Sequence, residues 1–388
     1  MSCDIELEIR AGSSPGQFIT SVLNAPSGGG TSAAMQLDVD GLLRERDTFE
    51  NMVLASAVSK RRILSGHEQQ LRRVGLQLFE SLFSGPVLGT YRASLVLAQQ
   101  RSEPLRVVLR LTAPRLAALP WEALFDPETD TYICRRESLV RRVPAPFTPD
   151  PLVVRAPLRV LGVVASPRGR AALDAAAEQE HLFTALAIPI AEHLIELDWV
   201  PQATWDGVHA KLLSNQWHVL HFIGHGEYDP TSDQGVIALV GEDGRAEVIE
   251  AERLVDLLHE ARPMPQLVVL NSCSSGQQGM QDLFSATAAA LVRSGISAVA
   301  AMQFTVSDPA AIRFATGFYT AIAHGHSVDD ATRAGRIAIL RVPYSLEWVT
   351  PVLDVRGERT QLFTLTPPQN EASEVNPPAH GPPKPAAA

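Results

Sequence analysis

From residue 158 onwards the sequence alternates between short apolar runs and longer helical patterns, and this alternation is the strongest constraint on the fold. The segments LRVLGVVAS (158–166) and QLVVLNSCSSG (266–276) contain the nearly continuous apolar runs of strands that are buried on both faces. Similar runs lie at 194–200, 217–226 and 296–304, with helix candidates between them. This order predicts an α/β fold, a mostly parallel sheet flanked by helices.

The first 150 residues have a different pattern, which predicts a helix-rich α+β region. Residues 5–10 alternate apolar and charged side chains as an exposed-face strand does, and 106–111 is a second β-rich run. Residues 39–63 and 67–83 carry apolar side chains three and four apart, as amphipathic helices do. The stretch 11–34 is rich in Gly, Ser and Pro and predicts a long loop.

A proline cluster separates these two patterns. Its five members, Pro144, Pro146, Pro149, Pro151 and Pro157, exclude a helix interior or a central strand. We therefore place a domain boundary here, between an N-terminal region (1–150) and a second domain (151–365). Residues 366–388 are rich in Pro and Ala without apolar periodicity, which predicts a disordered tail.

Composition narrows the class of protein. The 388 residues carry a net charge of −10, so we expect no direct contact with nucleic acid. The three cysteines, Cys3, Cys134 and Cys273, form neither a disulfide framework nor a CxxC zinc pair. We see no signal peptide and no apolar run long enough to span a membrane, and we expect a cytoplasmic protein without metal or cofactor. The short basic cluster Arg135, Arg136, Arg141 and Arg142 is interpreted as solvated charge beside a linker.

Two of the predicted strands end in turns that present a reactive side chain. In WHVLHFIGHG, His225 lies between Gly224 and Gly226, where the strand ends, and His221 lies deeper in the strand. In QLVVLNSCSSG, Cys273 follows the apolar run by three residues. Since ligands of open parallel sheets bind outside the carboxyl ends of the strands, both side chains are expected at the chemical edge of the sheet.

A His–Cys pair at this edge fits nucleophilic catalysis. The imidazole of His225 would convert the Cys273 thiol to the attacking thiolate and later protonate the leaving amine. The backbone N–H groups of Gly226 and Cys273 are candidate donors to the oxyanion. A lone histidine is more often structural and a lone cysteine more often a small buried hydrophobe. The coincidence of both in similar turns favours catalysis, whereas His221 is expected to be structural or to orient His225.

These residues resemble the CHAT-domain proteins, bacterial relatives of caspases and separases. The resemblance lies in HFIGHG and LNSCSSG, in LPWEALFD (119–126), in residues 304–336 and in PVLDVRGERTQLF (351–363). Cys273 follows His225 by 48 residues, close to the caspase spacing of about 50. The resemblance implies a caspase-like fold, His225 as general base, Cys273 as nucleophile and Gly226 as oxyanion contributor.

The resemblance also bears on substrate binding. Asn271, two residues before the nucleophile, occupies a position that borders the S1 pocket in caspase relatives. Asp308 aligns with an acidic position near the P1-binding site of separase-like members, where it would favour a basic P1 residue. The alternative for Asp308 is a helix N-cap, because Pro309 follows it.

The function expected from these features is a cysteine endopeptidase that cleaves a partner protein under the control of another protein or of the N-terminal region. A catalytically silent scaffold that acts through protein–protein contacts is the alternative. A nucleotide-binding α/β protein is disfavoured by the absence of GxGxxG after a strand and of GxxxxGK[ST]. A serine hydrolase is disfavoured because GxSxG is missing.

Overall fold

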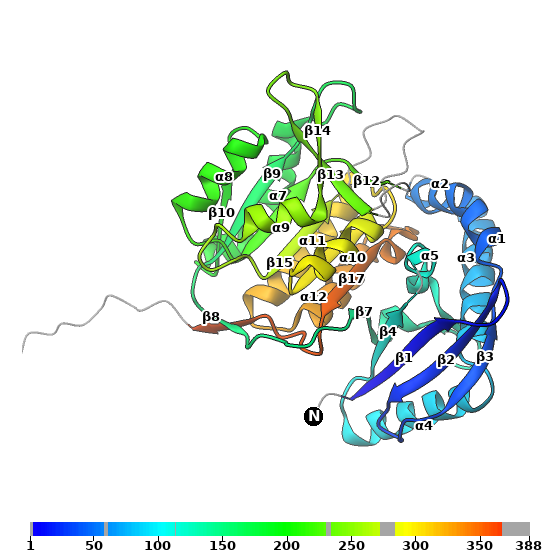
Figure 1. Cartoon of the computed structure of the whole chain (residues 1–388). Helices are drawn as coiled ribbons and strands as arrows, with labels where there is room; N and C mark the ends of the chain where they lie inside the picture. The colour runs from blue at the N-terminus through cyan, green and yellow to red at the C-terminus, as the bar shows by residue number, and fades with distance from the viewer. Residues whose placement is uncertain (1–2, 58–60, 113, 230–233, 272–283, 367–388) are drawn as a thin grey trace, which may run out of the picture.

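The computed structural model describes residues 3–57, 61–112, 114–229, 234–271 and 284–366, and a long twisted sheet runs through this part of the chain (Figure 1). Its strands are β1 (Asp4–Ala11), β2 (Gln17–Asn24), β3 (Ser32–Gln36), β4 (Arg106–Leu111), β7 (Ser138–Val143), β9 (Leu158–Val164), β10 (Ile195–Trp199), β11 (Val219–Ile223), β15 (Leu267–Asn271), β16 (Ala298–Met302) and β17 (Pro351–Arg356). They are ordered β10-β9-β11-β15-β16-β17-β7-β4-β1-β2-β3. The sheet therefore joins the N-terminal region to the rest of the molecule.

The five strands from β10 to β16 are parallel, and they are the apolar runs expected from the sequence. Every residue of β11, β15 and β16 is buried, which explains their continuous apolar sequences. Strand β17 pairs antiparallel with β16 and parallel with β7. The predicted α/β fold with a mostly parallel sheet flanked by helices is confirmed.

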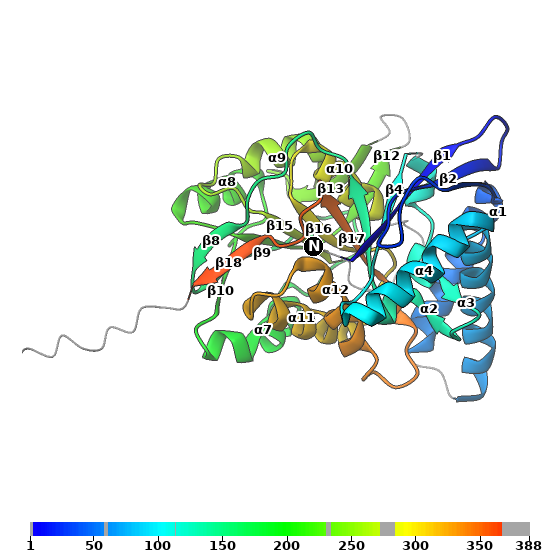
Figure 2. The same cartoon turned by 90° about the horizontal axis from the view of Figure 1, so that it is seen from below.

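Helices cover both faces of the sheet (Figure 2). On one face lie α8 (Trp205–Ser214), α9 (Ala251–Leu258) and α10 (Phe284–Ser294), and on the other α7 (Ala175–Ala191), α11 (Asp308–Ala323) and α12 (Val328–Ile339). A small antiparallel sheet of β12 (Gly226–Asp229), β13 (Gln234–Val240) and β14 (Ala246–Glu250) follows β11 and packs on α10. Two hydrophobic clusters, one on each side of the sheet, hold these layers together.

The N-terminal region contains four longer helices. They are α1 (Val39–Arg44), α2 (Arg46–Ser56), α3 (Arg61–Leu82) and α4 (Gly85–Arg101). The loop expected at 11–34 is wrong, because β2 forms there and pairs with β1, and β3 begins there and pairs with β2. These strands are largely exposed and lie beside glycines, so their apolar alternation is weak in the sequence. The boundary near residue 150 stays a prediction, and the sheet is continuous across it.

Short elements complete the connections between the two parts. They are α5 (Pro114–Ala117), the 3₁₀ turn η1 (Trp121–Ala123), β5 (Phe125–Asp126), β6 (Thr131–Tyr132), α6 (Ile133–Arg136), β8 (Leu152–Arg155), the 3₁₀ turn η2 (Glu347–Val349) and β18 (Phe363–Thr366). Strand β8 pairs with β18, so the start of the second part lies against the end of the described chain.

The interpretation of Arg141 and Arg142 as solvated charge is wrong. Both lie on β7 and are buried: Arg141 donates to the Glu122 carboxylate at 2.6 Å, and Arg142 pairs with Glu6 at 2.9 Å. Only Arg135 and Arg136 of the cluster are exposed. The carboxylate partners are remote in sequence, which is why the short basic cluster resembled a surface patch.

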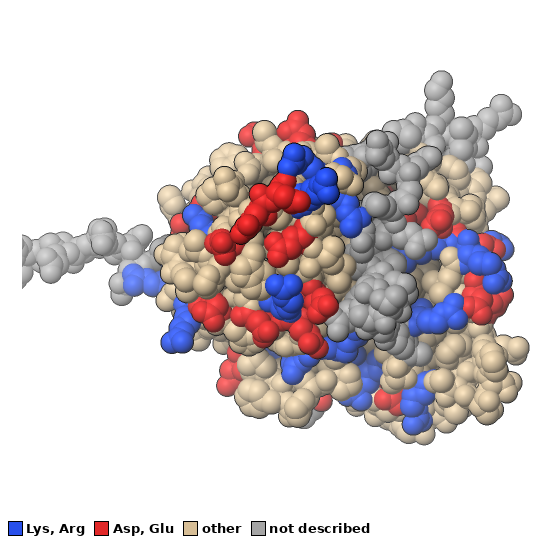
Figure 3. All heavy atoms as spheres, turned by 45° about the horizontal axis from the view of Figure 1, so that its top comes forward, with Lys and Arg blue, Asp and Glu red and all other residues tan. Residues whose placement is uncertain are grey.

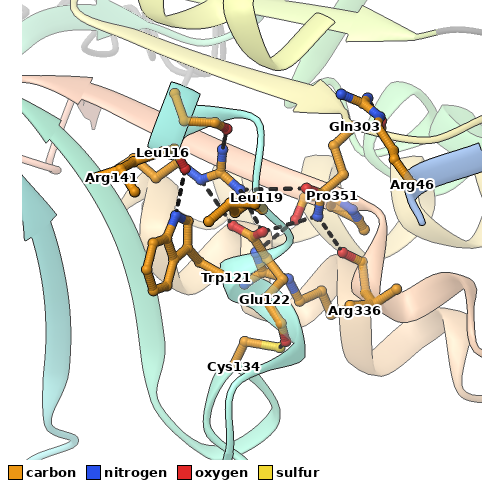
Figure 4. Close-up of polar contacts among 12 residues, drawn as sticks. Arg46, Leu116, Leu119, Trp121, Glu122, Cys134, Arg141, Gln303, Arg336 and Pro351 are labelled. Atoms are coloured by element: carbon orange, nitrogen blue, oxygen red, sulfur yellow. Dashed lines mark hydrogen bonds and ion pairs between the residues drawn. The ribbon is translucent and has the colours of Figure 1, made fainter. Parts of the chain in front are cut away.

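Glu122, in the LPWEALFD segment, is the centre of a buried polar network (Figure 4). Besides Arg141 it accepts a hydrogen bond from Gln303 Nε2 at 2.9 Å. Gln303 directly follows β16 and also donates to the Val349 carbonyl at 2.8 Å. A buried carboxylate is stabilised only when its partners are well placed, so this network fixes the end of β16 relative to the N-terminal region.

Acidic and basic side chains are interspersed on the face drawn in Figure 3 rather than gathered by sign. Among the described residues, none of the helices is both long enough and apolar enough to cross a membrane.

Candidate active site

The candidate site lies where β11, β15 and β16 end. Ile223 and Asn271, the last residues of β11 and β15, are paired in register in these adjacent parallel strands. His225 follows Ile223 by two residues, and Cys273 follows Asn271 by two residues. Cys273 itself lies outside the described residues. The two positions of the predicted dyad thus have the same offset from a pair of neighbouring residues at one edge of the sheet.

His225 is buried, with 8% of its surface exposed, and its ring is held by the backbone. Its Nε2 lies 2.9 Å from the carbonyl oxygen of Ala171, in the loop between β9 and α7. A carbonyl oxygen only accepts, so Nε2 donates and Nδ1 carries the lone pair in the neutral ring. The His225 carbonyl accepts from Ala238 N at 2.9 Å, which ties this residue to β13. This arrangement suits a general base that acts through Nδ1.

Gly226, the predicted oxyanion contributor, has a packing role. A Cβ atom at this position would lie 2.4 Å from Cε1 of Phe284, the fully buried first residue of α10. Glycine therefore lets the strand after His225 approach the helix that follows the Cys273 segment. Its assignment to the oxyanion site stays a prediction.

His221 is buried in the sheet, and its ring stays neutral over the physiological pH range. Its Nδ1 forms a 2.7 Å hydrogen bond with the hydroxyl of Tyr319 on α11. Burial lowers the pKa of His221 to about 3, so the ring is neutral at physiological pH. Its Nε2 has no hydrogen-bond partner among the described residues. The structural role expected for His221 stays a prediction, which these contacts favour.

A narrow pocket opens beside these strand ends, between α7 and α11. It is lined by twelve residues: Glu178, His181, Leu182, His221, Ile223, Val269, Asn271, Met302, Ala311, Ile312, Phe314 and Ala315. Its volume of about 20 Å³ holds a water molecule or an ion. Asn271 is buried on the pocket wall, and its Oδ1 has no hydrogen-bond partner among the described residues. The structure thus brings Asn271 and His221 together in the wall of a pocket that Glu178 and His181 also line.

Asp308 lies on the same side of the sheet, in the first turn of α11. It is exposed and is not itself the N-cap: the helix begins at Asp308, and Ser307 precedes it in an extended conformation. The helix N-cap that the sequence suggested at Asp308 therefore lies one residue earlier, at Ser307. The Ser307 N–H donates to Glu347 Oε1 at 2.6 Å, which anchors the start of the helix and places the Asp308 carboxylate near α7.

Glu178 and His181 of α7 were missed by the sequence analysis. They line the pocket, and one ligand-type atom from each lies within 4.8 Å of the other and of one from Asp308. Asp174 caps α7 by accepting from Ala177 N at 3.1 Å, so the same loop that holds Ala171 also orients the first turns of this helix. The signal available in the sequence was the i,i+3 spacing of Glu178 and His181, which puts both on one helix face.

The other two cysteines are unsuited to catalysis. Cys134 is fully buried and donates to the Glu122 carbonyl at 3.0 Å, and burial raises its pKa to about 11. Burial also raises the pKa of Cys3, which directly precedes β1, a strand separated from β15 by four other strands of the sheet. A thiolate is disfavoured at both positions, so Cys273 is the candidate nucleophile that remains.

Comparison with solved structures supports the fold. The chain is similar to a chain in a crystal structure of the Saccharomyces cerevisiae separase–securin complex at 3.0 Å, with a TM-score of 0.53 and 11% identity over 92% of this chain and 30% of that chain. A second structure of that complex at 2.6 Å gives a TM-score of 0.45 at 12% identity with the same two coverages. The Arg-specific cysteine proteinase gingipain R gives 0.40 at 12% identity over 77% of this chain and 76% of that chain.

This chain spans less than a third of the separase-complex chain that it matches. No curated protein matches it. The sequence model of the CHAT domain matches residues 72–353, which cover LPWEALFD, the His225 turn, Cys273 and β16. This match, on a parallel sheet whose neighbouring strands lead to His225 and Cys273, shows that the chain belongs to the CHAT domain family.

Proposed function

We propose that this chain is a cysteine endopeptidase that cleaves a partner protein with His225 as general base and Cys273 as nucleophile. The observation that carries the proposal is the in-register pairing of Ile223 with Asn271, each two residues before one member of the dyad. The Ala171 carbonyl holds His225 in the tautomer that a base needs. A buried ring fixed by backbone is preorganised for proton transfer.

The acidic groups near the pocket suggest which residue precedes the scissile bond. Glu178 and Asp308 place two carboxylates on the side of the sheet where Asn271 lies. A basic P1 side chain would pair with them through charge-assisted hydrogen bonds. Because the pocket volume is only about 20 Å³, a long basic side chain requires rearrangement of the pocket wall on binding.

The test compares wild type with Cys273→Ala on a peptide library and on candidate partner proteins. We expect the substitution to abolish cleavage, whereas the buried-cysteine control Cys3→Ala retains it. Cleavage that survives in Cys273→Ala would exclude the dyad. Wild-type protein that binds a partner but never cuts it would instead support the catalytically silent scaffold.

Asp308→Asn tests the P1 assignment in the same library. The variant should lose basic-P1 cleavage while retaining any cleavage after neutral residues. An unchanged P1 profile would remove Asp308 from the substrate site without affecting the dyad.

A further inference from the structure

Three side chains with metal-ligating atoms meet where α7 faces the start of α11. Glu178 and His181 are one turn apart on α7, and Asp308 begins α11. One ligand atom from each lies within 4.8 Å of the other two. They range from buried Glu178 through half-buried His181 to exposed Asp308, so the cluster opens to solvent at one end. Only small shifts of these side chains are needed to bring all three atoms to bonding distance from one ion.

A second observation points to a ligand at the inner end of the cluster. The pocket lined by Glu178 and His181 is also lined by Asn271, which is more than nine-tenths buried and whose Oδ1 has no hydrogen-bond partner among the described residues. A buried amide oxygen without a donor costs about 1–3 kcal/mol. The pocket volume of about 20 Å³ is enough for one water molecule between this oxygen and the cluster.

We propose that Glu178, His181 and Asp308 bind one Zn²⁺ ion at the mouth of this pocket. Zn²⁺ accepts imidazole nitrogen together with carboxylate oxygen, whereas Ca²⁺ and Mg²⁺ favour oxygen ligands alone. A Glu-x-x-His pair on one helix presents two ligands to the same ion. A water molecule as fourth ligand would donate a hydrogen bond to Asn271 Oδ1. The site departs from the expectation, made from cysteine spacing, that the chain binds no metal.

Resting on the proposed peptidase function, the site has a regulatory consequence. A bound ion would neutralise the Glu178 and Asp308 carboxylates that a basic P1 side chain would need, and it would lie against the part of the pocket wall formed by Glu178 and His181. Zn²⁺ would therefore inhibit cleavage after basic residues by competition with substrate.

Zinc binding is tested on the full chain carrying Cys273→Ala, because a thiolate beside His225 would itself bind Zn²⁺. ZnCl₂ is titrated into chelator-treated protein by calorimetry. We expect one site whose affinity falls by on the order of 100-fold or more in His181→Ala, since even loss of an outer-shell group costs about 10–100-fold. Glu178→Gln, which keeps the shape of the side chain, should weaken binding similarly, with an unchanged circular dichroism spectrum.

The matched control is His209→Ala, which removes the histidine of a second His–carboxylate pair: His209 Nε2 lies 3.9 Å from Glu260 Oε2. It should leave zinc affinity unchanged. Equal zinc affinity in His181→Ala and its parent would overturn the proposal, as would the absence of saturable binding in the parent. Binding of Ca²⁺ with the same affinity as Zn²⁺ would also overturn it. None of these readouts needs proteolysis, so failure of the zinc site and failure of the peptidase proposal are distinguishable.

Discussion

Gly226 and Phe284 are in contact so close that no side chain fits between them: a Cβ on Gly226 would lie 2.4 Å from Cε1 of the ring. Gly226 directly follows His225 and Phe284 is the first residue of α10, so their contact sets how closely the start of β12 approaches this helix.

Gly226→Ala should lower both stability and peptidase activity. Overpacking of this kind costs about 1–3 kcal/mol in the free energy of unfolding, and relief by backbone movement would displace His225. Urea denaturation and kcat/KM measure the two effects. Gly89→Ala is the control, because its Cβ meets nothing within 4 Å in helix α4. Partial recovery in Gly226→Ala with Phe284→Leu would confirm the contact, and a fully active Gly226→Ala would exclude it.

His221 should make the protein less stable in mild acid. Its pKa is lowered by burial to about 3 in the folded chain, whereas the unfolded chain has the ordinary value near 6.5. Between these values the unfolded state binds the extra proton, so stability falls as pH decreases from about 6.5 towards 3. At pH 5 the loss is about 2 kcal/mol relative to pH 8. NMR should show a His221 ring that does not titrate between pH 8 and 5, and titration near 6.5 would contradict the buried, neutral ring.

Asp354 should lower the stability of the protein as the pH rises, which is the opposite of the effect of His221. Burial raises its pKa to about 7, with Arg141 opposing the shift, so the folded chain holds a proton that the unfolded chain releases near pH 4. Its contribution therefore becomes less favourable as pH rises from about 4 to 7. Asp354→Asn should be more stable than wild type at pH 8, and the difference should shrink towards pH 4. Urea unfolding at both pH values measures this, and a variant less stable at pH 8 would show that Arg141 stabilises the charged form instead.

The N-terminal region should be required for folding. A chain of residues 151–388 lacks β7, so it exposes the edge of β17 that pairs through Asp354 and Arg141. It also removes Glu122 from its hydrogen bond with Gln303. An unpaired central edge favours aggregation. Size-exclusion chromatography should show aggregates for 151–388 and a discrete species for 1–366, which keeps every described strand. A folded, monomeric 151–388 would show that the boundary near residue 150 separates independent units.

Regulation by the N-terminal region is therefore better tested by point substitution. Glu50 on α2 accepts from the N–H and the hydroxyl of Thr305, at 2.9 and 2.6 Å, just after β16. Glu50→Gln retains the shape and weakens both hydrogen bonds. If α2 positions this segment for substrate, KM should rise more than kcat falls. Unchanged kinetics would exclude α2 as a control element.

The strands that could be predicted from the sequence are those in which nearly every residue is buried. Strands β11, β15 and β16 are buried throughout and β9 over most of its length, so their sequences are nearly continuous apolar runs. Strands β2 and β3 were missed because they are mostly exposed and their apolar residues do not alternate regularly with polar ones. A central parallel sheet can be inferred from the pattern of apolar runs, whereas an exposed edge hairpin depends on the pairing of its first strand, β2, with β1.

The candidate site was predictable where the chain itself brings residues to a strand end, as at His225 and Asn271. It was not predictable where helices meet. Glu178 and His181 approach Asp308 only because α7 packs on α11, and no local pattern records that contact. Arg141 of β7 likewise meets the Glu122 carboxylate of η1, 19 residues away in sequence, only in the folded chain.

The insertion of β7 between β4 and β17 also sets the order in which the molecule is assembled during synthesis. Arg141 of β7 pairs in register with Asp354 of β17, which is synthesised 213 residues later (354 − 141). At about 5–20 residues per second, this delay is roughly 10–40 s. Until then β16 lacks its antiparallel neighbour, so a nascent chain on the ribosome carries His225 and Cys273, the proposed base and nucleophile, beside an incomplete sheet. The proposed peptidase activity would therefore depend on the addition of β17, which is made late in synthesis.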